Sequence, residues 1–489
     1  MSPVILYSVH VVLALLLAGA VFAPRRWRRA ILVAAATIGS AAGIALAVAA
    51  AGDEAVWRST TLGQPRGVIA GAAVACAWLL AGALGNDRTL GSAALVGLAS
   101  SGVLLASLND WVVPGLALWL ASSVALVALL SQDELRVGAL LAIGLSDLAL
   151  VGAFALHALD DRVWTVPESL GGLPLGLALA SLVVRSGALP LTGVWEALDS
   201  PAAPALPLFL GGPLALLGVP LSAAGPWLAV AALVAALGLC GAALAGRELS
   251  LSLLGSWPVW LSLGLLVAAP AALQAGALAA LFAVTMVALC TATRGVARAA
   301  GGLLLGFLPP TAGWVAIVAT AVPAFDRAGG PSVVWSLVAG LLLLTVAAGV
   351  ALAARLARRS AHNTSEVRPT VAASVLLIAG LCLGLAPPSV LGLARDTLGD
   401  FDRVLSLSGA ALILALVAGA IAYRRGAGRA GFVAPEVEAT TATLVYSEDR
   451  ADTAVMVGVA ALIAVGTLAV VIYLAIEGLS YGFLPPSNL

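Results

Sequence analysis

Two charged residues, Asp147 and Arg185, lie deep inside apolar stretches of this chain. An ionisable side chain within a lipid bilayer is costly, so it usually has a partner and marks a functional position. We expect Asp147 and Arg185 to be partners. The pair predicts either a step in an ion path or a structural ion pair that fixes how two helices pack, and the sequence favours neither reading over the other.

Three further polar residues are candidates for lining a water-filled funnel. His157 follows Asp147 in the same apolar stretch, close to its end, where a neutral hydrogen-bond donor at the membrane surface needs no functional role. Glu196 and Asp199 follow the proline-containing segment after Arg185. They either line a cytoplasmic funnel or face solvent.

The basic residues are all arginine, because the 24 lysine and arginine positions include no lysine. Arginine stays protonated at any accessible pH, so it cannot take up and release protons as a relay group does. The four cysteines lie far apart, without the spacing of a metal site. Loops are too short for a soluble domain with its own cofactor. We therefore expect no metal, no cofactor and no catalytic site of the chain's own.

The apolar composition determines the surroundings of these residues. Of the 489 residues, 62% are hydrophobic and 10% are charged, whereas soluble domains carry about 25% charged residues. Runs of roughly 20 apolar residues, long enough to cross a bilayer as a helix, recur along the chain. Lipid cannot satisfy exposed backbone amides, so each run must be helical. The sequence predicts an all-α polytopic membrane protein with about 14–16 transmembrane helices.

Arginine clusters indicate the orientation of the chain. The cluster at 25–29 follows the first apolar run, so the positive-inside rule places it in the cytoplasm and the N-terminus outside. We expect a multi-pass protein of the cell inner (plasma) membrane. Other arginines at the ends of spans, Arg298 and Arg355 among them, are expected to reach lipid headgroups.

Glycine and proline gather in two apolar segments, 185–207 and 306–314. Proline removes a backbone donor and clashes with the preceding turn, so both segments predict helix breaks. Paired interruptions in two halves of a membrane chain indicate an inverted-repeat transporter with its path at mid-membrane, and ordinary kinks are the other reading. The prolines expected to break the helices are Pro190, Pro201, Pro204, Pro309 and Pro310.

Four stretches, in order along the chain, resemble motifs of one membrane-protein family. GLSDLALVGAF at 144–154 resembles its R-x-G-D span, and RSGALPLTGVWEALDSPAAP at 185–204 resembles K-S-A-Q-x-P-x-H-x-W-L-P-D-A-x-x-x-P-T-P. GRELSLSLLGSWPVWLSLGLL at 246–266 resembles D-x-K-x-x-x-A-Y-S-x-x-S-x-x-G, and GFLPPTAGW at 306–314 resembles G-x-P-P-x-x-G-F. These motifs belong to the antiporter-like membrane subunits of respiratory complex I, multisubunit cation/proton antiporters, membrane-bound hydrogenases and bicarbonate-uptake complexes. The resemblance is to the largest such subunit of complex I.

The resemblance implies two inverted five-helix repeats, each with a discontinuous helix. It divides the chain into N-terminal helices at 1–66, a first repeat at 67–222, a degenerate second repeat at 223–360, and C-terminal helices at 361–489 with a polar loop at 424–452. It also implies a membrane subunit of a larger energy-converting complex. Such a subunit translocates protons or cations, or couples to a neighbour that does.

The sequence departs from that family at its titratable positions. The family carries protons along the membrane midplane on a carboxylate, lysines, one histidine and waters. Here the carboxylate position falls near Trp119 or Leu120, and an arginine replaces the lysine of the first broken helix. The histidine and lysine positions of the second half fall on Met286 and Cys290, and a further one falls near Ile317. The second half therefore has no titratable axis in the sequence.

Three functions remain open on these grounds. The first is an antiporter-like subunit, and its alternative is a structural scaffold subunit that has lost the proton path. A stand-alone carrier of an apolar or zwitterionic solute is the third. The partners implied are the lipid bilayer and other membrane subunits, with a homologous antiporter-like subunit or a soluble catalytic subunit as candidates. The complex itself is a candidate for the NADH:quinone oxidoreductase type. A net charge of zero gives no reason to expect nucleic acid.

Overall fold

Helices make up almost all of the described structure. The computed structural model describes residues 3–51, 64–108, 111–131, 137–161, 165–190, 193–222, 224–245, 249–290, 292–293, 295–328, 330, 332–358, 367–386, 391 and 432–433. Of the predicted C-terminal helices at 361–489, only 367–386, 391 and 432–433 are described, so the predicted polar loop at 424–452 lies outside the described residues apart from 432–433.

The first eight α-helices and two 3-10 helices fill the first half of the chain. They are α1 (Pro3–Ala20), α2 (Arg25–Ala51), α3 (Gln64–Leu84), α4 (Leu90–Ser107), α5 (Val112–Leu130), α6 (Val137–Asp161), α7 (Gly172–Arg185), η2 (Val194–Asp199), η3 (Ala203–Ala205) and α8 (Leu206–Ser222).

Seven further α-helices follow in the second half, with one short pair of strands. They are α9 (Pro226–Ala245), β1 (Leu249–Ser250), α10 (Leu251–Ala268), η4 (Pro270–Ala272), α11 (Leu273–Cys290), α12 (Gly295–Leu305), α13 (Ala312–Ala328), α14 (Val333–Arg358), α15 (Val367–Leu385) and β2 (Phe432–Val433), where β1 and β2 pair in parallel.

Eleven helices in the described part are long and apolar enough to cross a membrane. The all-α polytopic fold is therefore confirmed. Helix α7, with 14 residues, is only about 21 Å long, less than the roughly 30 Å of a bilayer core. Helices α12 and α13 have 11 and 17 residues and are separated within the segment 306–314, where the sequence predicts a break. These short helices are the interrupted segments.

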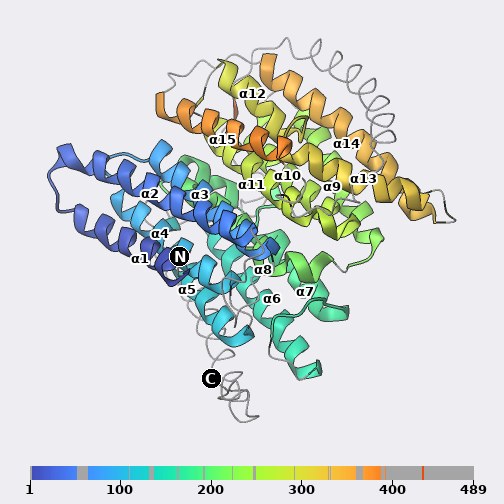
Figure 1. The fold of residues 1–489 in the computed structure, drawn as a ribbon, viewed down its shortest axis with the longest axis horizontal. Helices are drawn as coiled ribbons and strands as arrows, with labels where there is room; N and C mark the ends of the chain where they lie inside the picture. The colour runs from blue at the N-terminus through green and yellow to red at the C-terminus, as the bar shows by residue number, and fades with distance from the viewer. Residues whose placement is uncertain are drawn as a thin grey trace, which may run out of the picture.

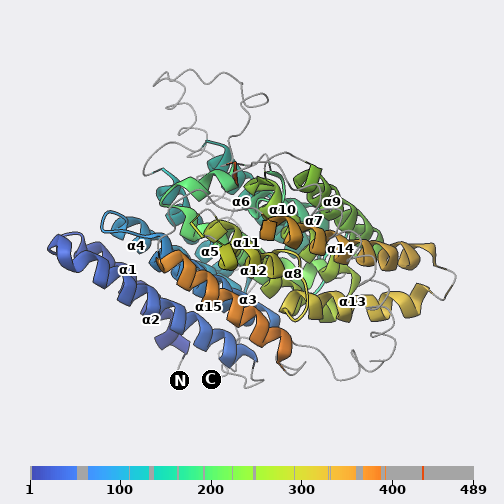
Figure 2. The same cartoon turned by 90° about the horizontal axis from the view of Figure 1, so that it is seen from above.

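Helices α1 to α5 lie at one side of the molecule and α9, α13 and α14 at the other, with α8, α10 and α11 between them (Figures 1 and 2). Every residue of α11 is buried, so this helix is the centre of the fold. The outer face of α15 carries exposed apolar residues at helical spacing, namely Val367, Val371, Val375 and Ile378. Such a face suits contact with lipid or with an apolar partner.

Trp78 in α3 holds four helices together near the N-terminus. Its indole Nε1 donates to His10 Nδ1 in α1 at 3.0 Å, and the two rings stack. Gly39 in α2 and Gly97 in α4 allow the ring to approach both backbones, because a Cβ on either glycine would lie 3.1 Å or less from a ring atom. The apolar runs of this region therefore pack through one buried aromatic side chain and small residues, as membrane helices commonly do.

Helix α7 ends before its first proline. Arg185 is its last residue, Ser186 caps it, and Gly187 adopts the left-handed conformation, with φ +69°, that commonly terminates helices. Pro190 follows three residues beyond Gly187, while Pro201 and Pro204 lie further along, next to or within η3. The first break is therefore set by glycine, and the prolines keep the following segment from resuming an α-helix.

The second break has the same form with a different residue. Phe307, at φ +53°, takes the left-handed position after α12, and Leu308 N donates to Leu303 O at 3.0 Å across it. A left-handed conformation is strained for a bulky residue. The exposed Pro309 and Pro310 follow, joined by a cis peptide bond. The chain is thus interrupted within 306–314, where the sequence predicts a break, and α12 ends before the two prolines.

Candidate functional site

The structure brings Asp147 and Arg185 into direct contact inside the protein. Arg185 Nη1 donates to Asp147 Oδ1 at 2.5 Å, and the Arg185 side chain is fully buried. Asp147 lies in the middle of α6, whereas Arg185 is the last residue of α7, where the negative end of the helix dipole favours a cation. The ion pair therefore joins a continuous helix to the end of an interrupted one.

Helix α5 completes the surroundings of the pair. Trp119 Nε1 donates to Asp147 Oδ1 at 2.8 Å, and Ser123 Oγ donates to the same oxygen at 3.1 Å. Arg185 Nη1 also donates to Ser123 Oγ at 2.9 Å. Three donors thus converge on Oδ1 of one carboxylate. Charge-assisted hydrogen bonds of this kind are stronger than neutral ones.

The guanidinium of Arg185 lies over the ring of Trp119, 4.3 Å from the ring centroid. This cation–π contact stabilises a buried cation without giving its nitrogens a hydrogen-bond acceptor. Arg185 Nε and Nη2, and the neighbouring Ser186 Oγ, are buried and have no hydrogen-bond partner in the described part of the chain. The pair is therefore neutral overall but not fully satisfied, which is unusual for a purely structural ion pair.

A second polar contact fixes α6 against α7. Ser146 Oγ lies 3.0 Å from Ser181 Oγ and donates to Ser181 O at 3.1 Å. Both serines are buried, one residue before Asp147 and four before Arg185. The spacing places both contacts on the facing sides of the two helices. The Ser146–Ser181 contact and the Asp147–Arg185 ion pair together fix the position of α7 along α6.

Sequence reasoning missed the role of Trp119. The resemblance predicts a family carboxylate near Trp119 or Leu120, neither of which can ionise. In the fold the Trp119 indole faces the carboxylate supplied one helix later by Asp147 and stacks on Arg185. Gly212 in α8 allows the other side of the ring to pack, because a Cβ there would lie 3.0 Å from it. A tryptophan within an apolar run carries no signal that separates this role from ordinary packing.

Trp119→Phe should destabilise the protein by about 1–2 kcal/mol, because it removes one hydrogen bond to a charged group and weakens the cation–π contact. Unfolding in bicelles by added denaturing detergent would measure the loss. The matched control is Trp335→Phe, since Arg327 lies 4.5 Å over that ring but is exposed. A loss in the control as large as in Trp119→Phe would contradict a specific role for Trp119.

The positions where the family has titratable groups in the second half are apolar and buried. Met286 and Cys290 lie in the fully buried α11, and Ile317 is buried in α13. Met286 packs against the glycine at position 301 in α12, where a Cβ would lie 2.8 Å from its sulfur. These side chains fill the space where a relay would require polar ones.

Two arginines of the second half are buried, contrary to the expectation that they reach headgroups. Arg298 Nη2 donates to Cys290 O at 2.5 Å, at the end of α11. Arg355 Nη1 donates to Ala243 O at 2.9 Å and also to Leu244 O, at the end of α9. The last carbonyls of a helix lack partners within it and attract cations. The two arginines therefore cap neighbouring helices.

The remaining predicted residues lie apart from the contacts of the ion pair. His157 is half-buried near the end of α6, and Glu196 is half-buried in η2. Asp199 is the last residue of η2, and its side chain lies outside the described residues. Within the described ranges, no three His, Cys, Asp or Glu side chains lie close enough to bind one metal ion.

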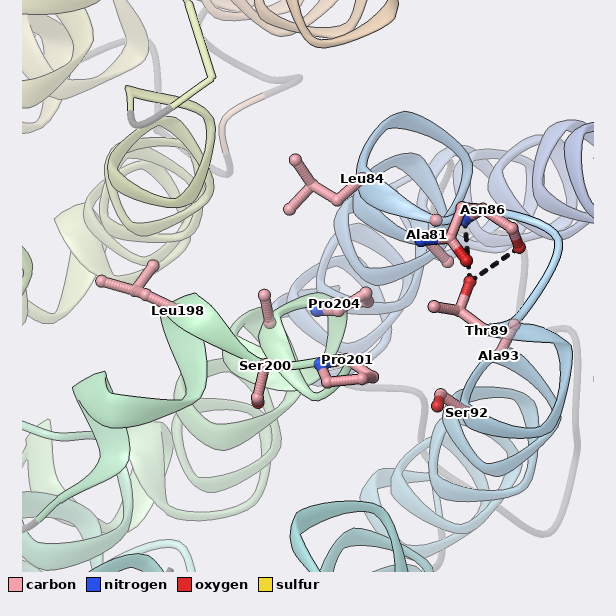
Figure 3. Close-up of a pocket in the computed structure, with 12 residues that line it drawn as sticks. Ala81, Leu84, Asn86, Thr89, Ser92, Ala93, Leu198, Ser200, Pro201 and Pro204 are labelled. Atoms are coloured by element: carbon pink, nitrogen blue, oxygen red, sulfur yellow. Dashed lines mark hydrogen bonds between the residues drawn. The ribbon is translucent and has the colours of Figure 1, made fainter. Parts of the chain in front are cut away.

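A cavity of about 320 Å³ lies beside the end of the first interrupted segment, between the α3–α4 turn and residues 198–204 (Figure 3). Its lining includes the hydroxyl groups of Thr89, Ser92 and Ser200 and the rings of Pro201 and Pro204. Glu196 does not belong to this lining among the described residues. The lining is more apolar than polar, and these three hydroxyl groups are side-chain partners that a water molecule could bind there.

Comparison with known proteins finds no family model and no curated protein that matches the sequence. Solved structures do match. A chain of the Mrp complex from Dietzia sp. DQ12-45-1b is 17% identical with a TM-score of 0.53, over 93% of this chain and 63% of that one. A chain of the membrane-bound sulfane sulfur reductase, an archaeal respiratory membrane complex, is 16% identical with a TM-score of 0.56, over 97% and 99%.

The protein shares their fold. The present chain spans 63% of the length of the Mrp chain, and 97% of it aligns with almost the whole of the reductase chain. At these identities the likeness concerns the backbone arrangement and not the chemistry of the site. It agrees with the fold that the four sequence motifs imply.

Proposed function

We propose that this protein is a membrane subunit of a multisubunit energy-converting complex, in which the Asp147–Arg185 pair responds to proton or cation movement. The observation that carries the proposal is a buried ion pair, at a helix break, whose arginine keeps two nitrogens without partners among the described residues. The shared fold with chains of an Mrp complex and of a respiratory membrane complex supports membrane subunits as partners.

Asp147 is the group that would change its protonation in this site. Arginine does not release its proton, so Arg185 acts as a fixed positive charge. Protonation of Asp147 would remove the charge that holds Arg185 Nη1 and leave a neutral carboxyl among the donors of α5. The buried cation would then need another acceptor, and the end of α7 would move to find one. Ion binding is thereby linked to motion at the break.

A scaffold function is the second candidate, favoured by the second half. Met286, Cys290 and Ile317 leave that half without a titratable path in the described structure. A subunit that kept the fold and lost ion movement would show this pattern. Isolation of a fully active complex without this chain would exclude the scaffold function.

Asp147→Asn should abolish proton or cation flux through the complex reconstituted in proteoliposomes, because the site then has no group that can change its charge. Flux is read with an internal pH-sensitive dye. Asp160→Asn is the matched control, since Asp160 belongs to the same helix but is exposed. Unchanged flux in Asp147→Asn, in an assembled complex, would exclude the ion-coupling role and leave the scaffold function.

We further propose an orientation with the N-terminus outside the plasma membrane.

A further inference from the structure

The backbone just beyond Arg185 is held by side-chain donors from two other segments. Gly187 O accepts hydrogen bonds from Trp195 Nε1 and from Ser256 Oγ, both at 2.7 Å. Ala188 O accepts one from Trp260 Nε1 at 2.9 Å. A helix break within a membrane protein frees backbone carbonyls, each of which costs free energy when buried without a donor. These three side chains supply the donors.

Two of the three donors come from α10, in the second half of the chain. Ser256 and Trp260 are four residues apart, so they lie on the same face of α10. Gly255 lets the Trp195 ring lie directly against α10, because a Cβ at Gly255 would overlap the ring. The first break is thus enclosed between its own 3-10 segment and α10.

Trp257, the residue after Ser256 on α10, donates a hydrogen bond at the second break. Trp257 Nε1 donates to Leu305 O at 2.8 Å, and Leu305 is the last residue of α12. Trp257 lies about 100° around the helix from Ser256. One turn of α10 therefore contacts both interrupted helices.

The held carbonyls control where Arg185 can lie. Gly187 and Ala188 follow Arg185 by two and three residues, and the left-handed φ of Gly187 turns the chain sharply there. Fixing these peptide planes fixes the direction in which α7 ends. The guanidinium reaches Asp147 from that end through a side chain that is fully buried. Because the surrounding packing leaves this side chain no room to change rotamer, a shift of the backbone at the end of α7 is passed on to the ion pair.

We propose that Ser256 and Trp260 are positioning residues for Arg185, so that α10 links the second half of the protein to the ion pair of the first. Its functional consequence rests on the role proposed above for Asp147 and Arg185. Neither side chain touches the carboxylate. Each acts through the backbone of the break.

The test uses the intact complex and observes Asp147 directly. With ¹³C-labelled aspartate, the infrared band of the Asp147 carboxylate is identified by its loss in Asp147→Asn. Trp260→Phe removes the indole N–H but keeps a ring, and Ser256→Ala removes the hydroxyl. Each substitution should shift or broaden the Asp147 band. The Ser256→Ala/Trp260→Phe double variant should change the band more than either single variant. Ser256→Thr keeps the hydroxyl and should retain the wild-type band. Flux should fall roughly three- to tenfold in Trp260→Phe, as expected for one lost hydrogen bond.

Trp257→Phe is the matched control, because it removes the same N–H from the same turn of α10 but at the other break. The Asp147 band should not change in this variant. An unchanged band in Trp260→Phe and Ser256→Ala would overturn the inference, and so would an equal shift in Trp257→Phe. A shifted band with unaltered flux would support positioning and contradict the function proposed for the pair, so the two failures are distinguishable.

Discussion

Arg185→Ala should lower the free energy of unfolding by about 3–5 kcal/mol, because it leaves the buried Asp147 carboxylate without its counter-charge. The remaining donors from Trp119 and Ser123 cannot replace a full positive charge. Adding Asp147→Asn to this variant should recover most of the loss, since no buried charge then remains unpaired. Stability is measured in bicelles by titration with a denaturing detergent, followed by near-UV circular dichroism.

The double variant also separates the two candidate functions. A stable Asp147→Asn/Arg185→Ala protein that assembles normally but passes no protons would support ion coupling, whereas full activity would support the scaffold function. Arg327→Ala is the control for removing an arginine stacked on tryptophan, and it should cost less than about 1 kcal/mol because Arg327 is exposed. A double variant as unstable as Arg185→Ala would contradict the uncompensated-charge explanation.

Gly349→Leu should destabilise the protein by roughly 3 kcal/mol, at the upper end of overpacking effects. Gly349 in α14 faces Gly306 at the end of α12, and a Cβ at Gly349 would overlap the Gly306 carbonyl. Backbone lies on the opposite side, so no rotamer change can relieve the clash. The two helices must separate, and the second break loses its support.

Gly340→Leu is the control, because Gly340 lies in the same helix, is exposed, and has no atom within 4 Å of the point that a Cβ would occupy. An apolar side chain there suits a lipid-facing surface, and stability should change by less than about 0.5 kcal/mol. The same detergent titration compares the two variants. Similar stability for Gly349→Leu and Gly340→Leu would exclude close α12–α14 packing as a source of stability.

The sequence is most informative where physics leaves few choices. Long apolar runs must be helices in lipid, and the helical architecture agrees with that prediction. Buried charges are so rare in this chain that Asp147 and Arg185 could be named as partners, although 38 residues separate them. Their roles in ion movement stay a prediction, as do the boundaries of the two repeats.

Other features need the fold before they have meaning. The arginines at 298 and 355 look like lipid anchors in a linear chain, because their neighbours are apolar and a span ends nearby. Only the packed structure brings the ends of α11 and α9 to them. Likewise, proline marks both breaks in the sequence, but α7 and α12 end earlier, at Arg185 and Leu305. The backbone turns left-handed two residues beyond each end, at Gly187 and Phe307. Local composition predicts that a break exists and not the residue at which it begins.

Two of the donors that stabilise the first break lie in α10, which is synthesised after the break itself. Ser256 and Trp260 follow the carbonyls they serve by 69 and 72 residues, so the ribosome completes α7 well before either donor is made. Until α10 arrives, Gly187 O keeps only the Trp195 donor, and Ala188 O lacks the Trp260 donor that it has in the described structure. The nascent first half therefore cannot settle fully into lipid. It must stay near the insertion machinery, or near water, until the second half enters the membrane and closes around it.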